Sequence, residues 1–388
     1  MKSCIRIPRI LIPARPERHW SVVACDQFTS DRAYWERVKR EVGARPSTMH
    51  FILPEAYLGE EDEERIREIH VNMHLAMTDE WMVKLDRGLV LTERSTSTGI
   101  RRGILACIDL EEYTFEKGVV STIRSSEEVV KERLPARVAL RRGALLEFPH
   151  AILFYKDKKD ALMRWILSEE MECLYDYDLL EGGGRLKGYF IPEEGAVSVV
   201  RDLYSRGTPC FAVADGNHSV AAAKAYWEEV KSGLSEREQK SHPARFMLVE
   251  FVNIYDSSVC FYPIHRLVKE VDAEAFISYF CKHVKCKREG NVLIPALAGG
   301  APAVSKTDEL IEEYLRANTG KVDYIHGDEE LFSFAKEENS VGIMLAPMEK
   351  EDFFAQLKKG NNLPKKTFSL GEGREKRYYT EGREIRYD

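Results

Sequence analysis

The pattern of apolar and polar positions predicts helices and strands along most of the chain. Apolar side chains at helical spacing indicate helices, and short apolar runs bounded by glycine, proline or polar residues indicate strands. The expected helices are 31–43, 60–82, 126–142, 159–171, 196–206, 218–231, 308–316 and 351–358. The expected strands are 89–92, 102–110, 150–155, 173–177, 211–214 and 244–255. Strands and helices alternate between residues 150 and 231, which favours a sheet with helices packed against it.

A glycine-rich hairpin at residues 181–191 interrupts this alternation. Because a hairpin joins antiparallel strands, the sheet is expected to be mixed in strand direction. The sequence therefore predicts an α/β (α+β) fold, a mixed sheet with helices and flanking lobes. We expect three lobes, namely an N-terminal α+β lobe of residues 1–120, an α/β core of residues 121–270, and a C-terminal α/β lobe of residues 271–388 with a basic loop and a terminal hairpin.

The composition and the length of the apolar runs argue against several classes of function. A chain of 388 residues that is 44% apolar can bury more than one core. Its 57 Lys and Arg against 64 Asp and Glu give a net charge of −7, so nucleic acid is not an expected partner. Prolines and arginines interrupt residues 6–15 before a signal-peptide core can form, and apolar runs elsewhere are too short for a membrane span. We expect a cytoplasmic protein without a membrane partner, and the sequence leaves formation of a homo-oligomer open.

The usual signatures of metal and cofactor sites are missing from the sequence. The eight cysteines form no Cys-x-x-Cys pair, which is typical of reduced thiols, so haem, flavin and structural zinc are not expected. His70 and His74 lie one helical turn apart, but Val71 stands where the zincin motif has Glu, and we interpret both as surface histidines. The glycine-rich stretches at 181–188 and 296–303 lack the features of a dinucleotide loop and of a P-loop.

The stretch FAVADGNHSVAAAKAYW carries the strongest chemical signal. An apolar strand runs into Asp215, Gly216, Asn217, His218 and Ser219, and an alanine-rich helix follows at once. A glycine turn that opens a helix directs backbone N–H groups and the positive end of the helix dipole at one point, which suits a phosphate. Asp215 could hold a metal or a ribose, and His218 could bond a phosphoryl oxygen. The alternative is that Asp215 or Asn217 only caps the helix, and spacing alone does not separate the two interpretations.

This box and several other segments resemble one known family. ADGNHSVAAA resembles the Asp-Gly-His-His-Arg-type box of domain-of-unknown-function family 1015, whose members are sometimes labelled SpoOJ/ParB-like. Segments similar to that family lie along nearly the whole chain: WSVVACDQFTSDRAYWE, IRSSEEVVKERLPARVALRRGALLEFPH, LYDYDLLEGGGRLKGY, HPARFMLVEFVNIYDSSVCFYPIHR and LPKKTFSLGEGREKRYYTEGREI. The box also resembles the phosphate-binding segment of the wider ParB/sulfiredoxin group, which includes CTP-hydrolysing partition proteins, sulfiredoxin and free-serine kinases. This resemblance implies a ParB/sulfiredoxin-like core that binds a nucleotide.

One position departs from the wider group. Partition proteins and serine kinases carry Arg after the histidine, whereas this chain has Ser219, so a strong phosphate clamp is missing. The candidate replacements are Arg266, Lys365 and Lys366. The resemblance implies that His265 and Arg266, expected to follow a strand that ends at Pro263, form a second wall of the site. The two lysines lie in a polar loop that could fold over an anion, although charge runs are usually solvated connectors.

Two further segments carry candidate residues. In ACDQFTSD, Asp26 could be a general base or a metal ligand, or it could close an Asx turn while Ser30 or Asp31 caps the next helix. In IRSSEEVVKER, Arg124 precedes an expected helix and could reach a phosphate. Glu127 lies in the expected first turn of that helix, where it suits the dipole even without chemistry. A salt-bridged cap is the alternative for this second segment.

Together these features predict an enzyme that binds a nucleotide or another small anionic phosphorylated molecule, with Mg²⁺, and transfers its phosphoryl group to a small molecule. Positioning and charge neutralisation carry most of such a reaction. The expected proton-transfer residues are Asp26, Glu127 and His218, with Asp215 as metal ligand. The expected phosphate- and nucleotide-binding residues are Asp215, Gly216, Asn217, His218, Ser219, Arg124, His265, Arg266, Lys365 and Lys366.

Two other functions are weighed against this one. A non-catalytic, ParB-like nucleotide-sensing protein would need a DNA-binding helix pair and a basic surface, and the sequence shows neither in recognisable form. Chemistry at Cys25 ranks last, because the adjacent Asp26 raises the pKa of the thiol instead of lowering it.

Overall fold

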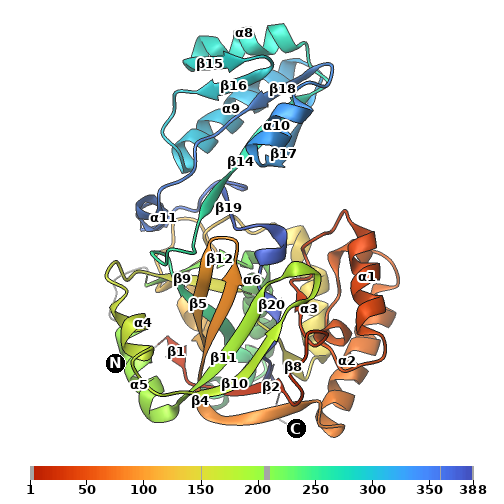
Figure 1. The fold of residues 1–388 in the computed structure, drawn as a ribbon, viewed down its shortest axis with the longest axis vertical. Helices are drawn as coiled ribbons and strands as arrows, with labels where there is room; N and C mark the ends of the chain where they lie inside the picture. Colours follow the sequence, from red (N-terminus) through yellow and green to blue (C-terminus); the bar gives the residue numbers. More distant parts are fainter. Residues whose placement is uncertain (1–3, 150, 205–209, 359, 387–388) are drawn as a thin grey trace. The chain divides into compact units, whose positions relative to one another are not determined.

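The computed structural model describes residues 4–149, 151–204, 210–358 and 360–386, which form two compact units (Figure 1). Unit 1 comprises Met1–Val259 and Glu372–Asp388, and unit 2 comprises Cys260–Gly371. Both units combine helices with sheets, which confirms the predicted α/β class. The expected three lobes are not what the chain forms. The boundary placed near residue 120 falls between two strands that pair in one sheet, and the last residues of the chain belong with unit 1.

Within the described residues, unit 1 is built on an 11-stranded sheet. Across the sheet the strands are β10 (Glu172–Asp178), β11 (Arg185–Pro192), β4 (Met82–Thr96), β5 (Gly99–Asp109), β13 (Phe246–Asn253), β9 (Ile152–Tyr155), β12 (Phe211–Asp215), β7 (Ile123–Arg124) and β6 (Tyr113–Thr114), with β1 (Ile5–Arg6) paired to β5 and β2 (Arg9–Pro13) paired to β4. β12 is parallel to β7 and antiparallel to β9, so the sheet is mixed as predicted.

The sheet of unit 1 is buried on both faces. Leu89 and Leu91 of β4 belong to one apolar core, whereas Val90 between them belongs to the other. Successive side chains of a strand point to opposite faces, so this continuous apolar run fills two cores at once. The helices of unit 1 are α1 (Arg32–Val42), α2 (Asp62–Thr78), α3 (Leu134–Gly143), α4 (Ala161–Ile166), α5 (Glu193–Tyr204), α6 (Asn217–Lys231) and α7 (Glu236–Gln239).

Two predicted helices in unit 1 show how local signals succeed and fail. α1 begins where its cap was expected, since the carboxylate of Asp31 accepts from the N–H of Tyr34 at 3.0 Å. The helix predicted from residue 126 is wrong at its start, because α3 begins at Leu134. Ser126 does not cap it, because its backbone and side chain bond to Asn217. One expected strand begins at His150 and one expected helix ends at Arg206, and both residues lie outside the described residues.

Unit 2 has a six-stranded sheet in its described residues. Its strands are, in order across the sheet, β15 (Cys286–Glu289), β16 (Val292–Pro295), β18 (Ser340–Ile343), β14 (Phe261–Lys269) and β17 (Lys321–His326). β19 (Phe368–Leu370) pairs with β14. The helices of unit 2 are α8 (Ala273–His283), α9 (Ala301–Ala317), α10 (Asp328–Phe334) and α11 (Lys350–Leu357). The strand end predicted at Pro263 is wrong, because Pro263 lies within β14. It pairs there only with Phe368 of β19, an edge-like position that tolerates a missing N–H.

The end of the chain is not the hairpin that its sequence suggested. β20 (Tyr378–Tyr379) pairs with β3 (Val22–Val23), and β21 (Arg383–Glu384) pairs with β8 (Leu146–Glu147). The two short strands therefore pair with distant segments of unit 1 and not with each other, which brings the basic residues before β20 into that unit. Within the ranges that the structure covers, no helix combines the length and the apolarity that crossing a membrane requires.

Candidate functional site

The strand-to-helix junction of the box is built around Gly216. β12 ends at Asp215 and α6 begins at Asn217, with Gly216 as the N-cap at φ 87° and ψ 27°. A Cβ at this position would lie 2.9 Å from the Cα of Ala151, so a larger residue does not fit. Glycine offers no side chain to cap the helix, and α6 therefore starts without a hydrogen bond from its N-cap side chain.

Asn217 connects this junction to the neighbouring strand. Its Oδ1 accepts from the backbone N–H of Ser126 at 3.1 Å and lies 2.7 Å from the hydroxyl of Ser125. Its Nδ2 donates to the hydroxyl of Ser126 at 3.1 Å. All three side chains are buried, so the amide of Asn217 holds the box in place beside β7.

His218 and Ser219 occupy the first turn of α6 with different surroundings. The Nε2 of His218 accepts from the backbone N–H of Val130 at 3.1 Å, which ties the half-buried ring to the segment before α3. Ser219 is buried and lines a cavity. The imidazole therefore has a structural contact, while the hydroxyl faces a space that a ligand can enter.

Two acids and two cations interact electrostatically at the end of β12, and we call Asp26, Arg101, Asp215 and Lys376 the Asp215 cluster. The Oδ1 of Asp215 accepts from the N–H of Gly216 at 3.1 Å, and its Oδ2 lies 3.7 Å from the Nζ of Lys376. Burial raises the pKa of Asp215, Lys376 opposes this effect, Asp26 raises the pKa further, and Arg101 lowers it. The net direction is upward, so the positive charges nearby do not fully compensate the carboxylate.

The cluster rests on a buried layer of paired charges. Arg101 donates to the backbone carbonyl of Glu375 at 3.0 Å, and its buried Nε has no hydrogen-bond partner in the described residues. Behind it, Arg377 lies 3.2 Å from Glu250 and also pairs with Glu381. Burial disfavours ionised Glu250, but Arg377 and Arg101 hold its pKa below the usual value. The two arginines of this layer are therefore shared with Glu250 and Glu381, and Lys376 is the cation that pairs with Asp215.

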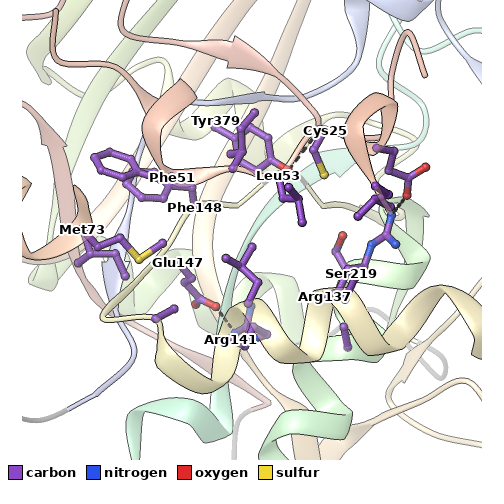
Figure 2. Close-up of a pocket in the computed structure, with 18 residues that line it drawn as sticks. Cys25, Phe51, Leu53, Met73, Arg137, Arg141, Glu147, Phe148, Ser219 and Tyr379 are labelled. Atoms are coloured by element: carbon purple, nitrogen blue, oxygen red, sulfur yellow. Dashed lines mark hydrogen bonds and ion pairs between the residues drawn. The ribbon is translucent and has the colours of Figure 1, made fainter. Parts of the chain in front are cut away.

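A cavity of about 100 Å³ is lined by Ser219, in the first turn of α6, and by residues of α3 (Figure 2). Most of its walls are apolar, and α3 runs along one side of it. The four cluster residues are not among those that line it, but Cys25, the neighbour of Asp26 in the chain, is. The lining residues are Cys25, Phe51, Ile52, Leu53, Glu55, Leu58, Met73, Ala136, Arg137, Leu140, Arg141, Ala144, Leu146, Glu147, Phe148, Ser219, Ala222 and Tyr379.

Cys25 is a neutral thiol in this setting. Burial raises its pKa to about 12, and the nearby Asp26 adds to the effect while Arg137 opposes it. Nucleophilic cysteines need a lowered pKa, so this thiol is a wall of the cavity and not a reactive group.

Residues 8–371 match the family described as "Protein of unknown function (DUF1015)". The chain belongs to this family. The family predicted from the sequence is thereby confirmed, and no curated protein matches the chain.

Several solved structures are similar to this DUF1015 chain at low identity. A free serine kinase in complex with AMP is 13% identical, with 72% of this chain and 92% of that chain covered and a TM-score of 0.38. A free serine kinase mutant in complex with ADP is 14% identical, with the same coverage of 72% and 92% and a TM-score of 0.38. A conserved hypothetical protein from Pyrococcus furiosus is 14% identical, with 68% and 89% covered and a TM-score of 0.34.

Arg124 and Glu127, two sequence candidates, lie near the box in unit 1 of the DUF1015 protein. Arg124 is buried on β7, and its guanidinium donates to the backbone carbonyls of Glu116 and Val119. Glu127 precedes α3 instead of lying in its first turn, and its carbonyl accepts from the hydroxyl of Ser125 at 2.7 Å. Backbone carbonyls of the same chain therefore hold the guanidinium of Arg124, and Glu127 does not lie in the first turn of α3, where the helix dipole would act on it.

The other four candidates belong to unit 2. Arg266 is buried in β14 and bonds both carboxylate oxygens of Asp308, at 2.7 and 2.9 Å. The ring of His265 is also buried, with Nε2 2.9 Å from Asp328 and Nδ1 accepting from a backbone N–H. Lys365 and Lys366 are exposed. The Asp215 cluster is formed by unit 1 alone, and its two cations are Lys376 and Arg101.

The sequence interpretation missed these two cations. Lys376 lies in GEGREKRYY, part of a segment that resembles the family, and no local motif marks it as a site residue. Arg101 lies on β5, one residue before the strand expected at 102–110, and no motif in the sequence marks it as a site residue. No group of three or more His, Cys, Asp or Glu side chains that could hold a metal ion is found in the described parts of the chain.

Proposed function

We propose that unit 1 binds a nucleotide or another small phosphorylated molecule at the start of α6 and transfers its phosphoryl group to a small molecule. The observation that carries the proposal is the meeting of Asp215, Asp26 and Lys376 at a helix N-terminus capped by glycine. The helix dipole and the ammonium of Lys376 both favour an anion there. The side chains of Asp215 and Lys376 are 20% and 13% exposed, so the cluster can be reached from solvent.

The cations of the cluster supply what Ser219 cannot. Lys376 would contact the transferring phosphate, and the unpartnered Nε–H of Arg101 would add a second donor. Together they take the place of the arginine that the wider group carries after the histidine. Because phosphoryl transfer depends mainly on positioning and charge stabilisation, this arrangement needs no reactive nucleophile.

Asp215 fits a magnesium ion that is shared with a phosphate. Mg²⁺ in phosphoryl-transfer sites is commonly held by one or two carboxylates together with phosphate oxygens. Asp215 would be that carboxylate, since burial and the nearby charge of Asp26 raise its pKa, and a bound cation relieves both effects. When bound, Mg²⁺ supplies charge neutralisation at the phosphate oxygens.

Asp26 is also the candidate to take a proton from the acceptor. It follows Cys25, which lines the cavity, and its charge acts on Arg137 of the same cavity. In the proposed reaction the acceptor oxygen forms a bond to the terminal phosphorus, the bond from that phosphorus to the leaving diphosphate oxygen breaks, and the acceptor proton passes to Asp26. His218 and Glu127 remain secondary candidates for this role.

Calorimetric titration with ATP, ADP and CTP in the presence of Mg²⁺ tests the proposal. We expect one of them to bind, and Lys376→Met to weaken it about ten- to hundredfold through loss of a charged hydrogen bond. Lys39→Met, at an exposed position near the end of α1, is the matched control and should bind as the wild type does. No heat with any nucleotide from folded protein would remove the proposal, and binding without turnover would favour a nucleotide-sensing role.

A further inference from the structure

The cavity beside the cluster has two chemically different ends. One end is apolar and is formed by Phe51, Met73 and Phe148, with the rings of Phe51 and Phe148 stacked at 4.9 Å (Figure 2). In Figure 2, Ser219 and Arg137 are drawn away from these three side chains, while the polar pair of Glu147 and Arg141 lies between the two groups. A molecule bound in this space would have an apolar body and a polar head directed at the first turn of α6.

The charges that line the cavity are already matched. Arg137 pairs with Glu55, and Arg141 pairs with Glu147. The same two carboxylates also accept from arginines outside the cavity, Arg133 at 3.4 Å and Arg383 at 2.9 Å. The lining itself thus holds two positive and two negative side chains, so a ligand of either charge would bring into the cavity a charge that no lining group balances. The lining therefore favours an uncharged ligand.

Two donors in the lining lack an acceptor. The Nε–H groups of Arg137 and Arg141 are buried and have no hydrogen-bond partner in the described residues. A buried donor without a partner costs about 1–3 kcal/mol, and a neutral ligand oxygen would supply the missing acceptor. Hydroxyl groups suit this position because they accept from N–H and still carry a proton to give.

We propose that the cavity binds the acceptor of phosphoryl transfer, and that this acceptor is a small uncharged alcohol with a branched aliphatic or aromatic body. The acceptor role rests on the proposed function of the Asp215 cluster, whereas binding of the alcohol does not. The volume of about 100 Å³ limits the body to a few heavy atoms, since an engineered apolar cavity of about 150 Å³ in another protein takes up benzene. The hydroxyl lies beside Ser219 and Asp26, where its oxygen receives the phosphoryl group, Asp26 receives its proton, and the nucleoside diphosphate leaves.

Isoamyl alcohol is the probe, titrated into the full chain and followed by ligand-observed NMR. Isovalerate and isoamylamine have nearly the same shape but carry a negative or a positive charge. We expect the alcohol to bind at least about tenfold more tightly than either charged molecule, because burying a charge without a new partner is costly. Equal binding of all three, or no binding of the alcohol to folded protein, overturns the inference.

Two substitutions on α2 locate the binding site. Met73→Trp fills the cavity from a position that is 2% exposed, whereas Val71→Trp on the same helix adds the same ring at a position that is 57% exposed. We expect the first to weaken isoamyl alcohol about tenfold or more and the second to leave it unchanged. Should Met73→Trp not fold, as judged by circular dichroism, Ala136→Leu narrows the same cavity. Alcohol binding that both cavity variants leave intact contradicts the assignment.

Nucleotide titrations of the same variants separate this inference from the proposed function. Met73→Trp should bind nucleotide as tightly as the wild type while it loses transfer of labelled phosphate from ATP to isoamyl alcohol. If isoamyl alcohol binds as expected and no nucleotide binds, the proposed function and the acceptor role both fail, and the cavity stands as an alcohol site. If nucleotide binds and no alcohol does, the proposed function survives and this inference fails.

Discussion

The start of α6 in unit 1 and the His265–Arg266 pair in unit 2 both offered charged residues for a phosphate site, but they differ in how far those charges are satisfied. Arg266 donates four hydrogen bonds to its own unit, two to Asp308 and two to the carbonyls of Ile264 and Lys366. The carboxylate of Asp215 receives one hydrogen bond from its neighbour and a loose ion pair at 3.7 Å from Lys376.

This difference separates a residue that stabilises the fold from one that can exchange partners with a ligand. Arg266 has no exposed surface, so a phosphate could reach it only by displacing Asp308. Asp215 has a raised pKa and a second acid nearby, and both features indicate a charge that the protein itself leaves partly uncompensated. Partly satisfied, partly exposed charges are what a binding site requires.

The largest effect should come from breaking the pair in unit 2. Arg266→Met leaves Asp308 without its buried partner, and we expect a loss of about 3 kcal/mol in the free energy of unfolding. Arg288→Met is the matched control, because its pair with Glu274 is exposed and should contribute less than about 1 kcal/mol. Urea unfolding measures both. If Arg266→Met folds with normal stability but no longer binds nucleotide, Arg266 contacts the ligand. Its role would then be binding and not stabilisation of the fold.

A smaller effect should come from Asn217, the structural member of the box. Asn217→Ala removes the hydrogen bonds to Ser125 and Ser126 and leaves buried groups without partners, which should cost about 2 kcal/mol. Asn318→Ala removes one hydrogen bond from an exposed residue to the carbonyl of Tyr314 and should change stability by less than about 0.5 kcal/mol. Thermal unfolding distinguishes the two. Unchanged stability with abolished nucleotide binding would show that Asn217 contacts the ligand instead.

The elements that sequence predicted well are those whose signals are local. The helix expected from His218 begins at Asn217, and the one expected from Asp31 begins at Arg32 behind the Asp31 cap. The helix expected from Ser126 begins eight residues later, because Ser126 finds its partner in Asn217 on a distant segment. A serine followed by glutamates looks the same in sequence whether it caps a helix or bonds to another strand.

The candidate site divides in the same way. Asp215 and Gly216 could be found because strand, acid, glycine and helix follow one another along the chain. Lys376 could not, because its place beside Asp215 depends on the pairing of β20 with β3. Arg266 is a candidate from the sequence as a replacement for the missing arginine, and the sequence does not show that Asp308 already binds its guanidinium. Local motifs indicate where a ligand could bind, and long-range packing decides which charges remain available for it.

The smallest effect is the contribution of Asp215 to the pH dependence of the free energy of unfolding. It tests most directly the comparison between the start of α6 and the Arg266–Asp308 pair. Burial and Asp26 raise its pKa in the folded state against the opposing charges of Lys376 and Arg101. A carboxyl whose folded pKa is raised contributes stability below its unfolded pKa of about 3.9 and loses it as the pH rises through the folded value. Asp215→Asn should therefore raise the free energy of unfolding at neutral pH, by less than about 2 kcal/mol, and the gain should vanish in acid.

Asp176→Asn provides a control of opposite sign for this prediction. The hydrogen bond from Arg185 lowers the pKa of Asp176, so its contribution is present above the unfolded pKa and is lost as the pH falls. Stability curves of both variants from acid to neutral pH should therefore diverge from the wild type in opposite directions. If Asp215→Asn instead lowers the free energy of unfolding at neutral pH, the protein already compensates the charge of Asp215. The charges at the start of α6 would then be as fully paired as those of Arg266 and Asp308.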